Sequence, residues 1–272
     1  GSLYEIILAL LLTCAVLVEG GVVKENCESH NEVETLKSDL DRPYLLAVDY
    51  STNTVYFSYS LNLDDDVFKT AFVNLNTKEF GEVAGINNGF AQTVDEKNHD
   101  IYIGGSDGVY KYSHNAKEAQ FLSQLGNIWT LYFKDVLYYS VFPSQFLYTF
   151  ANGVSARFKD LEDTKVDHFI IDNDDIMFYT NSTGLYGQKK GTKDSVLYRE
   201  YSKDGVRGLT TDINGNAFIC IADGIYKINK VNTSLDKVLS VDDAFGLAFD
   251  NENNIVYSDA MRLVRVKSVK SC

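Results

Sequence analysis

The sequence is poor in several residue types that mark particular classes of protein. Only two of its 272 residues are proline and 45% are hydrophobic, which argues against a disordered chain. Basic residues are also scarce, because 25 lysines and arginines stand against 38 acidic residues and the formal net charge is −13. A chain this acidic is not expected to bind a nucleic-acid backbone or an anionic membrane surface. Helical patterning is missing as well, since no segment of helical length in residues 44–268 repeats its apolar residues with a period of 3.6.

Long hydrophobic runs are limited to residues 6–18, a stretch too short to cross a bilayer comfortably. The small residues Gly20 and Gly21 follow it, although the basic residues that usually precede such a run are missing. The pattern is typical of the apolar part of a secretory signal peptide, and a buried strand is the alternative. We therefore expect residues 1–20 to be a signal peptide and residues 21–272 to form one domain.

Two acceptor sequences for N-glycosylation agree with a secretory route. They begin at Asn181 and Asn232, and each has the pattern Asn-x-Ser/Thr. Such triplets also arise by chance, so each supports an extracellular, secreted glycoprotein without establishing it.

Aromatic residues, by contrast, are plentiful at 13% of the chain, and they recur at a fixed place in a repeat. An apolar residue followed directly by an aromatic one marks a strand roughly every 40 residues. The aromatic members of these six pairs are Tyr56, Tyr102, Tyr138, Phe178, Phe218 and Tyr257. A period of this length built from short strands predicts an all-β fold, a six-bladed β-propeller, with no helix longer than about two turns in the repeats.

The sixth repeat holds only three strands before Cys272, which would leave an open sheet edge. Residues 32–37 can supply the missing outer strand, so we expect the last blade to be closed by an N-terminal strand. This closure would bring Cys27 close to Cys272, and we predict a disulfide between them, with Cys220 as a buried thiol. No CxxC motif or Cys/His cluster indicates a metal site.

Two stretches carry a resemblance to a known family. The start of the first repeat, DRPYLLAVDYSTNTVYFSYS (41–60), and the last repeat, LAFDNENNIVYSDAMRLVRVKS (247–268), resemble the ommochrome-binding proteins of moths and butterflies. The length, the apolar leader and the terminal cysteine agree. The resemblance implies a secreted haemolymph protein that binds an ommochrome, a tryptophan-derived phenoxazinone pigment, without catalysis and without a further cofactor. We expect a monomer whose partner is this small-molecule pigment.

The resemblance brings no set of binding residues, so the site is predicted from the propeller geometry. Ligands of propellers bind where the chain passes into the inner strands, at the mouth of the central channel. A flat aromatic acid needs a ring to stack on and a cation for its carboxylate, and the only tryptophan, Trp129, and Arg207 fill these roles. His168 is expected to bond a ring carbonyl, and Asp167 to orient Arg207 or meet an amine of the ligand. The remaining walls are expected from Tyr44, Phe90 and Phe245.

Two other functions remain open at this point. The last repeat also resembles gluconolactonases, whose propellers hold a divalent cation, and Asn88, Asn127 and Asp167 stand at comparable places. Tyr44 stands where those enzymes have a glutamate, which weakens a metal-dependent hydrolase. The second alternative is an extracellular protein-interaction propeller of the YWTD or NHL kind, which would use an exposed face rather than a pocket.

Overall fold

The computed structural model describes residues 28–60, 67–201 and 205–271. The chain divides into a unit of residues 33–267 and a terminal unit of residues 1–32 and 268–272. The larger unit contains the propeller. The predicted signal peptide and the predicted Cys27–Cys272 disulfide fall outside the described residues.

The described strands form six sheets of four strands each, and five of these sheets use consecutive strands. Blade 1 contains β2 (Tyr44–Asp49), β3 (Thr54–Ser60), β4 (Phe68–Asn74) and β5 (Phe80–Glu82). Blade 2 contains β6 (Ala91–Asp95), β7 (Asp100–Gly104), β8 (Val109–Ser113) and β9 (Glu118–Ser123). Blade 3 contains β10 (Ile128–Lys134), β11 (Val136–Val141), β12 (Tyr148–Ala151) and β13 (Val154–Arg157).

The remaining blades have the same plan, except that the last one includes the first strand of the chain. Blade 4 contains β14 (His168–Ile171), β15 (Ile176–Thr180), β16 (Gly184–Lys189) and β17 (Ser195–Glu200). Blade 5 contains β18 (Val206–Thr211), β19 (Ala217–Ile221), β20 (Gly224–Asn229) and β21 (Ser234–Ser240). Blade 6 contains β22 (Gly246–Phe249), β23 (Ile255–Ser258), β24 (Leu263–Ser271) and β1 (Glu28–Lys37).

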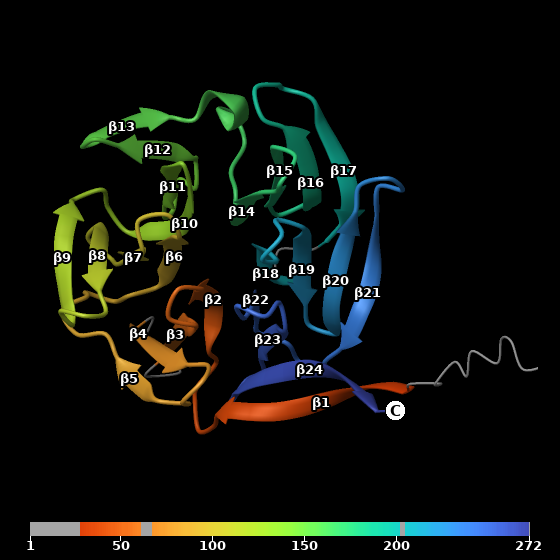
Figure 1. The fold of residues 1–272 in the computed structure, drawn as a ribbon. Coiled ribbons are helices and arrows are strands. Elements are labelled where there is room, and N and C mark those ends of the chain that lie inside the picture. The colour runs from red at the N-terminus through yellow and green to blue at the C-terminus, as the bar shows by residue number, and fades with distance from the viewer. Residues whose placement is uncertain (1–27, 61–66, 202–204, 272) are drawn as a thin grey trace, which may run out of the picture. The chain divides into compact units, whose positions relative to one another are not determined.

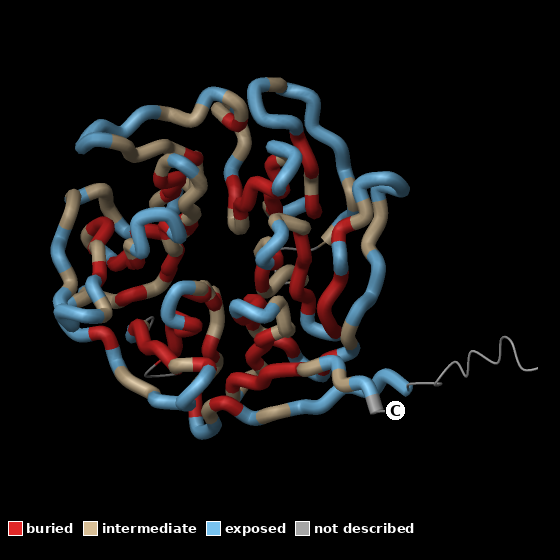
Figure 2. Tube along the Cα trace, in the orientation of Figure 1, coloured by how far each residue is buried: buried red, intermediate tan, exposed pale blue. Residues whose placement is uncertain are grey.

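Within the larger unit the blades succeed one another around a central axis, with β2, β6, β10, β14, β18 and β22 innermost (Figure 1). Each innermost strand contacts the innermost strands of both neighbouring blades, and β22 contacts β2, so the ring closes. Buried residues gather on the inner and middle strands, whereas the outermost strands are largely exposed (Figure 2). The predicted six-bladed β-propeller is therefore confirmed.

The aromatic residue that marks each repeat lies on the second strand of its blade. In blades 1 to 5 it packs against the next blade, whereas Tyr257 of blade 6 packs towards blade 5, in one cluster with Phe218 and Phe249. Tyr56 is fully buried, and its ring centre lies 6.1 Å from that of Tyr112 in blade 2. The rings of Phe218 in blade 5 and Phe249 in blade 6 are 4.8 Å apart. The repeat that is visible in the sequence is thus a repeat of inter-blade contacts, because each marker aromatic packs against a neighbouring blade.

Helical structure in the described ranges is limited to one 3-10 turn, η2 (Lys159–Leu161). This agrees with the absence of a helical period in the sequence. No helix among the residues that the structure describes is long and apolar enough to cross a membrane.

Aspartates end most inner strands and shape the next turn. Each carboxylate accepts a hydrogen bond from the backbone N–H two residues further on, at 2.9–3.1 Å. The aspartates in question are Asp95, Asp172, Asp212 and Asp250. These aspartates therefore act as turn formers, since an Asp side chain that bonds the local backbone stabilises such a turn.

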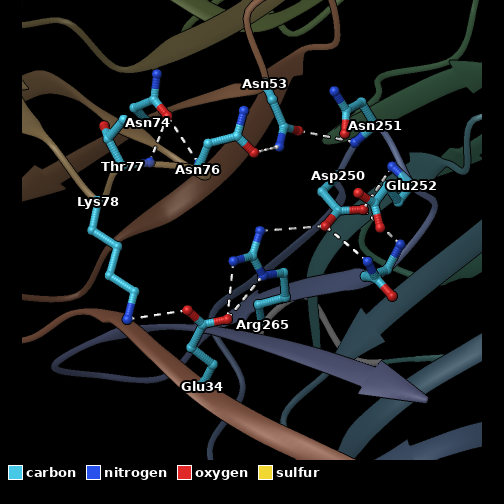
Figure 3. A network of polar contacts seen from close by, with 11 residues as sticks. Glu34, Asn53, Asn74, Asn76, Thr77, Lys78, Asp250, Asn251, Glu252 and Arg265 are labelled. Carbon is cyan, nitrogen blue, oxygen red and sulfur yellow. Dashed lines mark hydrogen bonds and ion pairs between the residues drawn. The ribbon is translucent and has the colours of Figure 1, made fainter. Parts of the chain in front are cut away.

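In blade 6 the strand order is β1-β24-β23-β22, so β1 occupies the outer position expected for residues 32–37. Glu34 on β1 receives two hydrogen bonds from Arg265 on β24, from Nη2 at 2.9 Å and from Nε at 3.2 Å (Figure 3). Arg265 also reaches inward, where its Nη1 lies 3.5 Å from Oδ2 of Asp250 at the end of β22. One buried guanidinium therefore ties the outermost strand of this blade to the innermost one.

The same network reaches blade 1, the other side of the closure (Figure 3). Lys78 Nζ lies 3.0 Å from the second oxygen of Glu34. Asn53 accepts a hydrogen bond from the backbone N–H of Asn251 at 3.0 Å, and its amide donates to Asn76 at 2.9 Å. Polar contacts thus join the first and last blades of the ring.

Candidate functional site

Two adjoining cavities lie along the inner strands. The first, which we call the rim cavity, has a volume of about 570 Å³. Its lining consists of Arg42, Tyr44, Leu45, Phe90, Trp129, Asp167, His168, Val206, Arg207 and Phe245. The second, which we call the channel cavity, has a volume of about 230 Å³ and shares several of these walls. All seven residues predicted from the sequence line the rim cavity.

Six of these residues occupy equivalent places, one in each blade, at or next to the start of the inner strand. They are Tyr44, Phe90, Trp129, His168, Arg207 and Phe245, which we call the rim residues. The propeller symmetry brings them together although up to 201 positions separate them in the sequence. Their convergence results from strand position alone, because every inner strand starts at the same end of the channel.

The aromatic rim residues form one continuous wall. Phe90 and Trp129 are stacked, with ring centres 5.4 Å apart and planes inclined by 19°. Tyr44 meets Phe90 edge-on at 5.6 Å, and Phe68 of β4 contacts both rings from behind. Stacked and edge-on aromatic pairs are both favourable, so the wall is rigid before any ligand arrives.

Asp167 fixes the orientation of the indole. Its Oδ1 accepts hydrogen bonds from Trp129 Nε1 at 3.2 Å and from Gln145 Nε2 at 2.7 Å. Its backbone carbonyl accepts a third bond from the hydroxyl of Thr130 at 2.9 Å. Asp167 therefore positions Trp129, and the structure does not show the contact with Arg207 that the sequence suggested.

Arg207 lies against Phe245 and has a different acidic neighbour. Its guanidinium carbon is 4.4 Å from the centre of the Phe245 ring. Its Nη2 is 3.7 Å from Oδ1 of Asp243, which is longer than a hydrogen bond. The face of the guanidinium is thus held by a ring, and its N–H groups have no hydrogen-bonded carboxylate among the described residues. This arrangement suits the binding of an anion from solution.

His168 contributes a neutral polar group. Burial lowers the pKa of this imidazole below its usual 6.5, although Asp167 and a hydrogen bond with the backbone of Val206 act in the opposite direction. When one nitrogen of a neutral imidazole is hydrogen-bonded to the backbone, the other nitrogen can still bond a ligand. It can therefore serve a polar atom of a ligand without adding charge.

Arg42 lines the rim cavity as well, and the sequence prediction missed it. The prediction gave Arg207 the role of the cation, whereas two arginines line the cavity. Arg42 bonds Asp41 through Nε at 2.9 Å. The available signal was its place just before Pro43 and Tyr44, at the start of the first blade.

Polar side chains contribute to the wall of the channel cavity. Gln92, Thr93 and Thr130 contribute to its wall, and the amide nitrogen of Gln92 donates to the carbonyl of Leu45. The amide oxygen of Gln92 is buried and has no hydrogen-bond partner among the described residues. The channel cavity is therefore lined by hydrogen-bond acceptors and hydroxyls as well as by aliphatic side chains.

The oxygen ligands considered for a divalent cation do not gather around either cavity. Asn88 and Asn127 line neither of them, and Asn88 Oδ1 accepts a hydrogen bond from the backbone of Phe68. Asp167, the third candidate, is occupied by Trp129 and Gln145. Across the described ranges no three His, Cys, Asp or Glu side chains form a group suited to a metal ion.

Three further predicted features lie away from the cavities. Cys220 is a buried free thiol, as expected, and burial raises its pKa to about 12. Asn232 is exposed at the turn before β21, whereas Asn181 is half-buried and its side chain accepts bonds from Thr183. Glycosylation at both positions stays a prediction.

The fold and the cavity define a class: a six-bladed β-propeller with an aromatic pocket and two arginines at one end of its channel. No family model matches the chain. Among curated proteins it is similar to the ommochrome-binding protein of Manduca sexta, with 29% identity over 276 residues, covering 97% of this chain and 99% of that protein. The resemblance to ommochrome-binding proteins that the sequence indicates is thereby confirmed.

Solved structures with the same fold include enzymes. A gluconolactonase from Xanthomonas campestris matches with a TM-score of 0.69 at 12% identity, covering 88% of this chain and 90% of that one. A virginiamycin B lyase from Staphylococcus aureus matches with a TM-score of 0.58 at 8% identity, covering 89% and 100% of the two chains. At such low identity these similarities establish the fold and nothing about the chemistry.

Proposed function

We propose that this chain is a secreted, non-catalytic carrier of the haemolymph that binds an ommochrome pigment in the rim cavity. The observation that carries the proposal is the combination of a stacked aromatic wall with an arginine on one cavity. The similarity to an ommochrome-binding protein along nearly the whole chain supports it.

The aromatic wall suits a flat, fused-ring ligand. The Phe90–Trp129 pair offers the extended π-surface on which such a ring system stacks, and each aromatic contact adds about 0.5–1.5 kcal/mol beyond area burial. The cavity of about 570 Å³ lies within the range of pockets that hold small organic ligands. Size and shape are therefore compatible with a tricyclic phenoxazinone.

The polar groups suit the substituents of such a pigment. Arg207 matches a carboxylate in two-point geometry, and the neutral His168 matches a ring carbonyl or ring nitrogen. None of these groups is arranged as a nucleophile with an adjacent base, which favours binding over turnover.

Titration of the purified protein with an ommochrome tests the proposal. Trp129 is the only tryptophan of the chain and lines the cavity, so quenching of its fluorescence reports binding at this site. The visible band of the pigment gives an independent reading. If saturating pigment does not quench the fluorescence of Trp129, the rim cavity is refuted as the site. Calcium-dependent hydrolysis of a gluconolactone would favour the enzyme instead.

Substitutions locate the contribution of single residues. Trp129→Ala and Arg207→Ala should each weaken pigment binding about tenfold or more, since one such contact is worth about 1.4 kcal/mol. Phe121→Ala and Arg262→Ala are the matched controls, because neither residue lines a cavity. The assay for all four is equilibrium dialysis read by pigment absorbance, and equal binding by variants and controls would contradict the assignment.

A further inference from the structure

A second arginine on the rim cavity has no role in the binding of a single carboxylate by Arg207. Arg42 precedes β2 in blade 1, whereas Arg207 lies on β18 in blade 5, so blade 6 and Phe245 separate them around the ring. Both guanidiniums line one cavity in a chain whose net charge is −13. The lining of this cavity thus holds two arginines and one aspartate, although acidic residues outnumber basic ones in the whole chain.

The backbone holds Arg42 in place before any ligand binds. Its N–H donates to the carbonyl of Ala260 at 2.7 Å, and the N–H of Leu40 donates to the carbonyl of Met261 at 2.8 Å. Arg42 and Leu45 both have positive φ angles, 47° and 53°, which are unfavourable for residues with a side chain. Such angles persist where the surrounding structure fixes them, as these backbone bonds do here.

The fork of each guanidinium is available to a ligand. Arg42 uses only Nε on Asp41, which leaves Nη1 and Nη2 without a bond to any described residue. Arg207 has only the long contact with Asp243. The single acidic lining residue, Asp167, already accepts bonds from Trp129 and Gln145 on one oxygen. Both arginines thus line one cavity, and among the described residues no carboxylate accepts a hydrogen bond from the Nη atoms of either.

We infer that the rim cavity selects an aromatic dianion, whose two carboxylates are bound separately by Arg42 and Arg207 while the rings stack on Trp129. This inference rests on the proposed function and goes further, because it assigns Arg42 a role and fixes the number of acidic groups on the ligand. A planar fork recognises a carboxylate by two parallel hydrogen bonds, so each arginine accounts for one acidic group. A pigment with a single carboxylate would leave the Nη atoms of one arginine without an acceptor from the ligand, and Arg42 would keep only its bond to Asp41.

Three phenoxazinones that differ in their number of carboxylates distinguish the contribution of charge to binding from that of the ring system. The probes are a phenoxazinone dicarboxylate, its monomethyl ester and the neutral 2-aminophenoxazin-3-one, each titrated by tryptophan fluorescence at fixed ionic strength. The dicarboxylate should bind about tenfold more tightly than the monoester. In Arg42→Gln this difference should fall to less than about twofold, because only the dicarboxylate loses a contact. Arg262→Gln, which changes the same charge outside the cavity, should keep the parent difference.

The outcomes distinguish this inference from the proposed function. If the parent protein binds all three probes with equal affinity, the carrier function stands and the dianion selectivity is refuted. If Arg42→Gln weakens all three probes alike, Arg42 acts on the shape of the cavity and its assignment to one carboxylate is wrong. If the parent protein binds none of the probes, the pigment-carrier proposal fails and this inference fails with it.

Discussion

Replacement of Arg265 by methionine should destabilise the propeller at the junction of its first and last blades. Only 6% of Arg265 is exposed, and its guanidinium bonds Glu34 on β1 and pairs with Asp250 at the end of β22 (Figure 3). Methionine keeps most of the side-chain volume and removes the charge. The substitution therefore tests the polar contacts rather than the packing.

The expected loss depends on the contacts that remain after the substitution. Removal of one partner of a buried ion pair costs about 3–5 kcal/mol, because the other charge is left buried. Asp250 keeps its hydrogen bonds from the backbone of Glu252 and from the backbone and side chain of Asn254. Glu34 keeps Lys78 at 3.0 Å. Both carboxylates are thus partly compensated, and we expect a loss near the lower limit, about 3 kcal/mol.

Urea unfolding followed by circular dichroism measures this loss as a lower midpoint at an unchanged slope. Arg262→Met is the control, since Arg262 pairs with Asp259 on a partly exposed surface and such pairs contribute about 0–1 kcal/mol. A loss below about 1 kcal/mol in Arg265→Met, or one equal to the control, would refute the view that this network closes the ring.

The remaining predictions concern the site, the pH dependence and the cysteines. Asp167→Ala removes the acceptor of the indole N–H, so pigment binding should weaken about fivefold while unfolding changes little, as titration and urea unfolding would show. Burial lowers the pKa of His168, so below pH 6.5 the unfolded chain binds a proton that the folded chain does not, and the stability of the fold decreases as the pH falls. In His168→Asn the midpoint of thermal unfolding should therefore decrease less between pH 7 and lower pH than it does in the parent protein. Cys220, buried and with a raised pKa, should react with iodoacetamide only after denaturation, and non-reducing peptide mapping should link Cys27 to Cys272.

The fold could be predicted because each blade carries an aromatic residue at the same place on its second strand, and this residue recurs about every 40 positions in the sequence. Each of blades 1 to 5 places one large aromatic against the next blade, as Tyr56 does towards blade 2 and Phe218 towards blade 6, so the sequence repeats the packing. The rim residues could be predicted for the same reason, since strand order alone brings the start of every inner strand to one end of the channel. Local pattern was enough wherever each blade repeats the same arrangement.

The parts that escaped prediction depend on contacts between distant segments. Arg42 is placed at the cavity by a positive φ angle and by two backbone bonds, its own to Ala260 and that of Leu40 to Met261, which no periodicity reveals. Arg265 stands in a strand among valines, and its burial makes sense only beside Glu34, 231 positions away. Asp167 was expected to orient Arg207 or to meet an amine of the ligand, whereas the structure shows it accepting a bond from the indole N–H of Trp129.

The same propeller supports lactonases, lyases and this aromatic pocket, so the fold does not decide the chemistry. The chemistry is decided by which groups stand near the six inner-strand starts and where their atoms point. In this chain Asn88 turns its oxygen to the backbone of Phe68, and Asn127 lines neither cavity. The positions that face the rim cavity hold rings and guanidiniums, as Trp129 and Arg207 illustrate. A metal ion needs several converging oxygens, and the described residues form no such group of His, Cys, Asp or Glu. A flat anion needs a ring and a guanidinium fork, and Trp129 and Arg207 place both residue types at this rim.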